Sequence, residues 1–218
     1  ARQVSEPWNK NEVVPPSGVP LAALVPTYKV SSRSLPLIKH LSRRCPTLIV
    51  DDGSPCTSDS VLVKASEMGA KILRMPERSG IARSLNLGLK FANEVRASWL
   101  LTVDQDTTIS EHHIEDSLSF LNSDTGQHLR IGALGAACIH VDGHEIDLIN
   151  DPCEETRDVP ELIQSGTFWN VQTMTSLGGF SDTLGMDGID AEACLRMRES
   201  GYRVLALNEL EIIHEIGN

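Results

Sequence analysis

The chain has 218 residues, 40% of them hydrophobic, which is the size and composition of one globular domain with a well-buried core. Its formal net charge is −11, and no basic cluster is longer than Arg43-Arg44. Nucleic acids and anionic membranes attract surfaces rich in Lys and Arg, so the charge argues against both as main partners. The cysteines lack any C-x-x-C spacing, which is typical of reduced thiols in a cytosolic protein and not of a disulfide framework or zinc site.

The first half of the chain alternates short apolar runs with helical patterns. After a proline-containing arm at residues 1–20, apolar runs predict strands at residues 21–25, 47–50, 71–73 and 99–103. Helical patterns lie between them, at residues 35–41, 61–68 and 81–95. Strands that alternate with helices form right-handed βαβ units, so we expect a parallel sheet covered by helices on both faces.

The second half has a less regular pattern. We expect helices at residues 109–121, 171–177 and 190–200. We expect strands at residues 131–139, 164–169, 202–207 and 210–214. Residues 140–160 are polar, and their histidines and acidic residues could suggest a metal site. Their spacing fits no ligand pattern, however, so we predict a solvated loop.

Two carboxylates follow the predicted strand at residues 99–103. Trp99 to Val103 is mostly apolar, and Asp104-Gln105-Asp106 comes next. In open α/β sheets ligands bind outside the carboxyl ends of the strands, and hard oxygen ligands at that place suit Mg²⁺ or Mn²⁺ together with substrate phosphates. The alternative is that Asp104 and Asp106 only cap a turn and the next helix.

Further motifs occur in order along the chain. They are Val25-Pro26-Thr27-Tyr28, Val50-Asp51-Asp52-Gly53-Ser54, Gly80-Ile81-Ala82 with Asn86 and Gly88, Asp104-x-Asp106, Gly178-Gly179-Phe180, Asp190-x-Glu192 with Leu195-Arg196, and His214. Over residues 21–218 the series resembles the family 2 glycosyltransferases, above all their rhamnosyltransferase-like and galactofuranosyltransferase-like members. The resemblance implies the α/β GT-A fold, with a Rossmann-like, mostly parallel central sheet flanked by helices. The chain departs from the pattern at Arg78, where Asn is commoner.

The resemblance implies a site for a nucleotide-diphosphate sugar. Asp51 and Asp52 would accept hydrogen bonds from a pyrimidine N–H, while Pro26 and Thr27 would lie beside the base. A carboxylate paired with a buried donor is selective, because a wrong base leaves the pair unmade. Asp52-Gly53 could also be a simple turn. Arg83 would add positive charge near the base or the diphosphate, although a solvated helix residue is an equal alternative.

The resemblance also implies a divalent metal, Mg²⁺ or Mn²⁺, bound by Asp106 and His214. The metal would offset charge on the diphosphate leaving group, and Asp104 would contact the ribose or a metal-bound water. A lone histidine is more often structural than a ligand, so the assignment of His214 as a ligand depends on its place after an apolar strand.

Asp190 is the candidate general base, which takes the proton of the acceptor hydroxyl while the donor leaves from the opposite face. An N-cap role for Asp190 is compatible with this. We expect Leu195 to pack inward and Arg196 to brace the acidic end of the helix. Asp187 and Glu192 are competing carboxylates. Gly166 and Asp187 are the candidates for contacts with the sugar or acceptor.

The sequence therefore predicts an inverting, metal-assisted glycosyltransferase that uses dTDP-rhamnose or a UDP-sugar and a glycan or lipid-linked acceptor. We expect it in the cytoplasm or at the inner face of the plasma membrane. The GT-A domain should begin at residue 21 and continue past residue 218, as such enzymes extend into acceptor-binding helices.

Two alternatives stay open. A nucleotidyltransferase on a similar sheet would need a glycine-rich, basic triphosphate loop, whereas Pro26-Thr27-Tyr28-Lys29 offers one lysine. A catalytically silent nucleotide-sugar binding module would keep Asp52 and Asp106 but lack a working base or acceptor platform.

Overall fold

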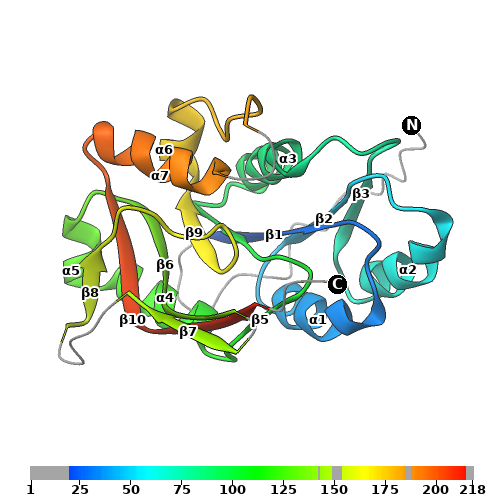
Figure 1. Cartoon of the computed structure of the whole chain (residues 1–218), viewed down its shortest axis with the longest axis horizontal. Helices are drawn as coiled ribbons and strands as arrows, with labels where there is room; N and C mark the ends of the chain where they lie inside the picture. The colour runs from blue at the N-terminus through cyan, green and yellow to red at the C-terminus, as the bar shows by residue number, and fades with distance from the viewer. Residues whose placement is uncertain (1–19, 142, 149–153, 185–187, 215–218) are drawn as a thin grey trace.

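A computed structural model describes residues 20–141, 143–148, 154–184 and 188–214. Its strands are β1 (Leu21–Thr27), β2 (Thr47–Asp51), β3 (Lys71–Arg74), β4 (Trp99–Thr102), β5 (Thr107–Ile109), β6 (Ile131–Val141), β7 (His144–Asp147), β8 (Thr156–Asp158), β9 (Thr167–Asn170) and β10 (Arg203–His214). Within these residues they form one curled sheet of order β3-β2-β1-β4-β9-β6-β10-β5, with β7 beside β6 and β8 beside β10 (Figure 1).

The first half of the fold confirms the prediction. Its helices are α1 (Leu35–Ser42), α2 (Asp59–Glu67) and α3 (Ile81–Glu94). β1 pairs in parallel with β2 and β4, and β2 pairs in parallel with β3. Parallel strands need long crossover connections, and the helices between these strands supply them.

The sheet becomes mixed beyond β4. β9 runs antiparallel to both β4 and β6, and β5 runs antiparallel to β10. The expected helix at residues 109–121 is wrong at its start, because Ile109 pairs with Ile212 and ends β5, and α4 spans His113–Asn122. The expected strands at residues 202–207 and 210–214 form the single strand β10, with a register shift between Leu207 and Glu211.

The expected solvated loop at residues 140–160 is also wrong in part. β7 pairs antiparallel with β6, and β8 pairs antiparallel with β10. All four β7 residues are exposed, so the strand has the polar composition of a loop. Backbone pairing with the long strand β6 stabilises β7. Because none of its side chains is buried, its sequence has no apolar–polar alternation from which a strand could be predicted.

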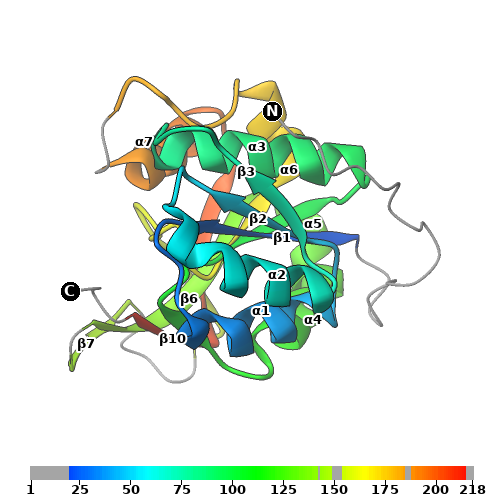
Figure 2. The same ribbon diagram turned by 90° about the vertical axis from the view of Figure 1, so that its right-hand side faces the viewer.

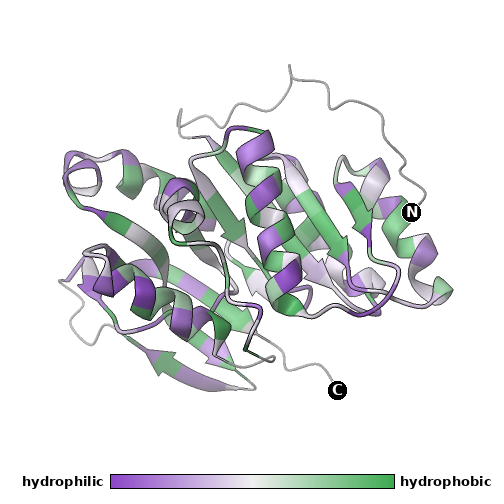
Figure 3. Cartoon of the chain, turned by 90° about the horizontal axis from the view of Figure 1, so that it is seen from above, coloured by the Kyte–Doolittle hydropathy of each residue, from purple (hydrophilic) through white to green (hydrophobic). Residues whose placement is uncertain are grey.

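Helices cover both faces of the sheet. α1, α2 and α4 lie on one face, and α3, α6 (Val171–Ser176) and α7 (Ile189–Glu199) lie on the other, while the short α5 (Asp124–His128) follows α4 (Figures 1 and 2). Each face has its own apolar core, in which strand residues such as Leu101 and Leu100 point to opposite sides. Figure 3 shows the inner strands in green and the helices banded in green and purple, as expected of amphipathic covering helices. Among the described helices, none has the length and apolar character of a membrane span.

Gly88 allows α3 to lie close against β1, and we expect Gly88→Ala to lower the free energy of unfolding by about 1–3 kcal/mol. A Cβ at this position would be 2.4 Å from Cδ2 of Leu24, whose side chain is completely buried. Urea unfolding followed by circular dichroism measures the effect. The exposed Lys90 in the same helix gives the control, Lys90→Ala. Equal unfolding midpoints for the two variants would contradict the close packing.

Candidate functional site

The Asp104-Gln105-Asp106 turn connects β4 to β5 at the carboxyl end of the parallel strands. Thr107 N–H donates to the Asp104 carbonyl (3.1 Å), which closes the turn. The Asp104 N–H donates to the Ser165 hydroxyl (2.9 Å), and that hydroxyl donates to Thr107 Oγ1 (2.8 Å). The turn is therefore fixed from within and from the segment that precedes β9.

Gln164 connects two of the predicted site residues. Its side-chain Nε2 donates to Asp104 Oδ1, and its backbone N–H donates to Asp190 Oδ2 (3.1 Å). Asp190 is the second residue of α7, and its Oδ1 accepts from the N–H of Ala191 (2.9 Å). Gln164 is not among the site residues predicted from the sequence. The structure brings Asp104 and Asp190 to the same place through this one residue.

The middle residue of the turn, Gln105, binds the loop after β1. Its Nε2 donates to the Tyr28 carbonyl (3.0 Å), and its Oε1 accepts from the Tyr28 N–H (3.2 Å). The Gln105 carbonyl also accepts from the Ser34 hydroxyl (2.8 Å). The segment around Pro26 and Thr27 is thus joined to the Asp104–Asp106 turn by Gln105, which is not among the site residues predicted from the sequence.

Asp51 and Asp52 lie at the end of β2 in different surroundings. Asp51 is completely buried, with its carboxylate against the Ser54 hydroxyl and with Oδ2 at 3.2 Å from Arg74 Nε. Asp52 Oδ1 accepts from the N–H (2.6 Å) and hydroxyl (2.8 Å) of Ser79, and Oδ2 accepts from the Gly80 N–H (3.1 Å). Asp52 therefore holds the segment that leads into α3, and its second oxygen retains a lone pair for another donor.

Gly53 allows this segment to come close. Its φ is +71°, and a Cβ there would be 2.6 Å from the backbone carbon of Glu77. Both the backbone conformation and the space require glycine.

A cavity of about 440 Å³ lies at the N-terminus of α3, next to Asp52. Its lining includes Arg78, Gly80, Arg83 and Asp182. The Arg78 guanidinium stacks over the Tyr28 ring at 4.3 Å from the ring centroid. Two arginines thus line one cavity beside the segment that Asp52 holds, and Arg78 is the residue at which the sequence departs from the family pattern.

Gly166 is buried beside the Asp104–Asp106 turn. Its N–H donates to the Thr102 carbonyl (2.7 Å), and its carbonyl accepts from Nε2 of the buried His113 (2.9 Å). Burial lowers the pKa of His113 to about 4, so the ring is neutral at physiological pH. Gly166 has a φ of +78°, and Ile212 packs against it. Its hydrogen bond to Thr102, two residues before Asp104, connects it to the start of the turn.

Of the predicted residues, His214 can be placed only in part and Asp187 not at all. The backbone of His214 pairs with Thr107, the residue after Asp106, so β10 leads to the Asp104–Asp106 turn. The side chain of His214 and the whole of Asp187 lie outside the described residues.

The remaining motifs form a framework behind the site. Arg196 binds Glu192 at 2.8 Å through both Nε and Nη2, and its Nη2 also donates to the Gly179 carbonyl (2.8 Å). Asn86 of α3 accepts from the Phe180 N–H and donates to the Phe180 carbonyl, both at 2.8 Å. The expectation for Leu195 is wrong: its side chain is 51% exposed, because α7 buries Ala193, Cys194 and Met197 instead.

Known proteins resemble this chain in sequence. Residues 23–128 match the glycosyl transferase family 2 sequence model. The chain is 23% identical over 211 residues to the dTDP-rhamnosyl transferase RfbF of Shigella flexneri, covering 90% of this chain and 69% of that protein.

Solved structures share the fold. GalNAc-T7, crystallised with UDP, GalNAc and Mn²⁺, superposes with a TM-score of 0.72 at 11% identity, over 91% of this chain and 44% of that one. Residues 1–349 of S. aureus TarS, in complex with UDP-GlcNAc, superpose with a TM-score of 0.66 at 16% identity, over 92% and 60%. This chain thus spans less than two thirds of either structure. Residues 23–128 are thus similar in sequence to family 2 glycosyltransferases, and the described residues share the GT-A fold of these structures.

Proposed function

We propose that this domain transfers a sugar, with inversion, from a nucleotide-diphosphate sugar to a glycan or lipid-linked acceptor. The observation that carries the proposal is the pair of hydrogen bonds from Gln164 to Asp104 and Asp190. A single-displacement transfer needs the leaving diphosphate and the general base on opposite sides of one sugar ring. Two carboxylates bridged by one residue suit that requirement.

The nucleotide would bind between the loop after β1 and the segment before α3. Asp52 supplies a carboxylate oxygen to a pyrimidine N–H, and Pro26 and Thr27 lie beside the base. Asp51 was also expected to bind the base, but its carboxylate is completely buried against Ser54 and Arg74, so in this proposal it supports the loop that carries Asp52. Arg78 and Arg83 contribute positive charge at the cavity, which a chain of net charge −11 needs in order to hold a diphosphate. A dTDP-sugar or a UDP-sugar fits this description.

The Asp104–Asp106 turn fits a divalent cation. Asp106 supplies a hard carboxylate oxygen, and the backbone pairing of His214 with Thr107 brings an imidazole-bearing residue to the same turn. One or two protein ligands together with substrate phosphates are the usual environment of Mg²⁺ and Mn²⁺. Such a cation would neutralise charge on the diphosphate as the glycosidic bond breaks.

In this scheme Asp104 orients the ribose, and Asp190 takes the proton of the acceptor hydroxyl. Hydrogen bonds from Ala191 and Gln164 fix the Asp190 carboxylate, so no reorientation is needed when the acceptor arrives. Gly166 would lie next to the sugar, and Asp187 would contact the acceptor. The cytoplasmic face of the plasma membrane, where nucleotide sugars meet lipid-linked acceptors, is the proposed place of action.

A thermal-shift panel with and without Mn²⁺ tests the proposal, followed by an assay of nucleoside diphosphate release. UDP- or dTDP-sugars should raise the melting temperature in the presence of Mn²⁺, by an amount equivalent to about 2.7 kcal/mol at 100 times Kd. Adenosine and guanosine diphosphates serve as matched controls that should give no shift. With an acceptor glycan, the bound donor should then be turned over.

The same panel separates the alternatives. A silent binding module would give the shift without release of the nucleoside diphosphate. A nucleotidyltransferase would respond to a nucleoside triphosphate and a sugar phosphate, and would release pyrophosphate. Either result would overturn the proposal.

A further inference from the structure

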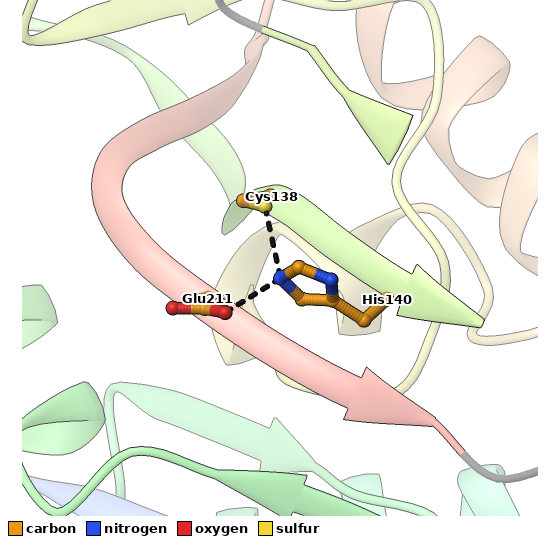
Figure 4. Close-up of side chains that lie close together, drawn as sticks. All are labelled: Cys138, His140 and Glu211. Atoms are coloured by element: carbon orange, nitrogen blue, oxygen red, sulfur yellow. Dashed lines mark hydrogen bonds and ion pairs between the residues drawn. The ribbon is translucent and has the colours of Figure 1, made fainter. Parts of the chain in front are cut away.

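Three side chains with metal-binding atoms meet between β6 and β10. Cys138 and His140 belong to β6, and Glu211 belongs to β10 (Figure 4). His140 Nε2 lies 2.5 Å from Glu211 Oε1 and 3.4 Å from Cys138 Sγ. The sulfur, nitrogen and oxygen atoms all lie within 4.8 Å of one another.

The backbone brings these residues together by ordinary sheet geometry. Cys138 pairs with Glu211 in the parallel β6–β10 ladder, directly after the register shift in β10. His140 is two residues beyond Cys138 and so projects from the same face of β6. Ile139, between them, is buried in the core on the opposite face.

We propose that Cys138, His140 and Glu211 bind one divalent transition metal of the Zn²⁺ class, with water as the fourth ligand. A thiolate, an imidazole and a carboxylate are a borderline-soft donor set, which favours Zn²⁺ over the Mg²⁺ or Mn²⁺ expected at the Asp104–Asp106 turn. Three protein ligands and a water are the ligand number of an open zinc site.

The surroundings of His140 suit a ligand that binds through Nε2. Glu145 of β7 lies on the other side of the ring, with Oε2 at 3.9 Å from Nδ1. A carboxylate near Nδ1 favours the tautomer that carries its proton there, which leaves the Nε2 lone pair for the metal. The ion would enter between Nε2 and the carboxylate of Glu211, whose side chain is 56% exposed. Cys138 gives its proton to water as the sulfur binds.

A catalytic cysteine triad is a poorer explanation of the same residues. In such a triad the carboxylate contacts the ring nitrogen opposite the one that faces the thiol. Here Glu211 contacts the same nitrogen as Cys138, and Glu145, on the side of the opposite nitrogen, is 3.9 Å from Nδ1, which is too far for a hydrogen bond. Burial and the nearby carboxylates of Glu145 and Glu211 also raise the pKa of the Cys138 thiol, which disfavours a free thiolate nucleophile.

The proposed zinc site is separate from the donor site but on the same strand. Glu211 precedes His214 by three residues, which is about 10 Å along a strand. A metal held by both strands would fasten β6 to β10 just before β10 reaches the Asp104–Asp106 turn.

Titration of the metal-free 218-residue chain, without an affinity tag, tests the proposal. Co²⁺ should bind with one-to-one stoichiometry and give the near-ultraviolet absorption of a cobalt–thiolate bond, and Zn²⁺ should displace it. Cys138→Ser should remove this absorption. Glu211→Gln should weaken Co²⁺ affinity by at least about tenfold, the loss caused at metal sites by changing a group that merely orients a ligand.

Two matched variants complete the test. Cys56 is a free, exposed thiol elsewhere, so Cys56→Ser should keep the absorption. Asp106→Asn should keep it as well, since that residue belongs to the donor site. Circular dichroism establishes that each variant is folded, and Glu211→Gln decides the matter should Cys138→Ser fail to fold. No saturable Co²⁺ binding, or an absorption that survives loss of Cys138, would overturn the proposal and leave an ordinary His–Glu ion pair.

Discussion

Asp190→Asn is expected to reduce kcat for sugar transfer by about 10²- to 10⁴-fold while donor affinity changes little. Asparagine has the same shape and can accept the Ala191 N–H or the Gln164 N–H with its one remaining oxygen. It cannot take a proton from the acceptor hydroxyl. A loss confined to kcat, measured beside donor affinity by calorimetry, separates the missing base from a damaged binding site.

Glu192→Gln is the matched control for this result. Glu192 stands on the same helix, but both of its oxygens bind Arg196, which holds the loop around Gly179. Its replacement should lower stability and leave the acceptor chemistry in place. Near-normal turnover in Asp190→Asn would show that Asp187 or Glu192, and not Asp190, is the general base.

Asp106→Asn is expected to weaken Mn²⁺-dependent binding of UDP or dTDP on the order of 100-fold or more, since even a group that orients a metal ligand is worth 10- to 100-fold. The backbone around Asp106 is fixed by Ser165 and Thr107, so the fold should survive the change. Titrating Mn²⁺ at constant nucleotide measures the loss. Binding of nucleotide without metal, which depends on Asp52, should stay as it is.

Asp182→Asn is the control for Asp106, because Asp182 is a second carboxylate near the expected donor that lines the cavity with Arg78 and Arg83. It should leave the Mn²⁺ dependence intact. An unchanged Mn²⁺ dependence in Asp106→Asn would show that another residue holds the metal.

In the first half, β1, β2 and β4 were predictable because each is a buried apolar run followed by polar residues. β1 and β2 are buried throughout, and their helical connections have clear amphipathic patterns. The local sequence is sufficient to predict these strands. A strand buried on both faces is a continuous apolar run whichever strands it pairs with. The carboxylates at the strand ends were found for the same reason.

In the second half, β6, β9 and β10 were predicted, whereas β5 and β8 were not, because each has only three residues and depends on pairing with the distant β10. β5 is only Thr107–Ile109 and exists through pairing with β10, about a hundred residues later. β7 is wholly exposed. Long-range pairing of this kind leaves no periodic signal within the segment itself.

The missed site residues, Gln105 and Gln164, are both glutamines. An amide side chain is common at surfaces, and no spacing distinguishes one that donates to a site carboxylate from one that faces water. The signal was context alone: Gln105 lies between the two turn carboxylates, and Gln164 precedes the Ser-Gly that enters β9.

The hydrogen bonds between Gln105 and Tyr28 have a consequence for how a donor would be received. They join the loop that would hold the base to the turn that would hold the diphosphate before any ligand is present. Ordering these two loops is then part of folding, and the nucleotide does not have to bring them together. The domain should therefore bind the nucleotide as a preorganised receptor, with a small entropic penalty and little backbone movement at that end. Redesign of the domain for a different pyrimidine would have to change the loop after β1 without breaking the two hydrogen bonds between Gln105 and Tyr28.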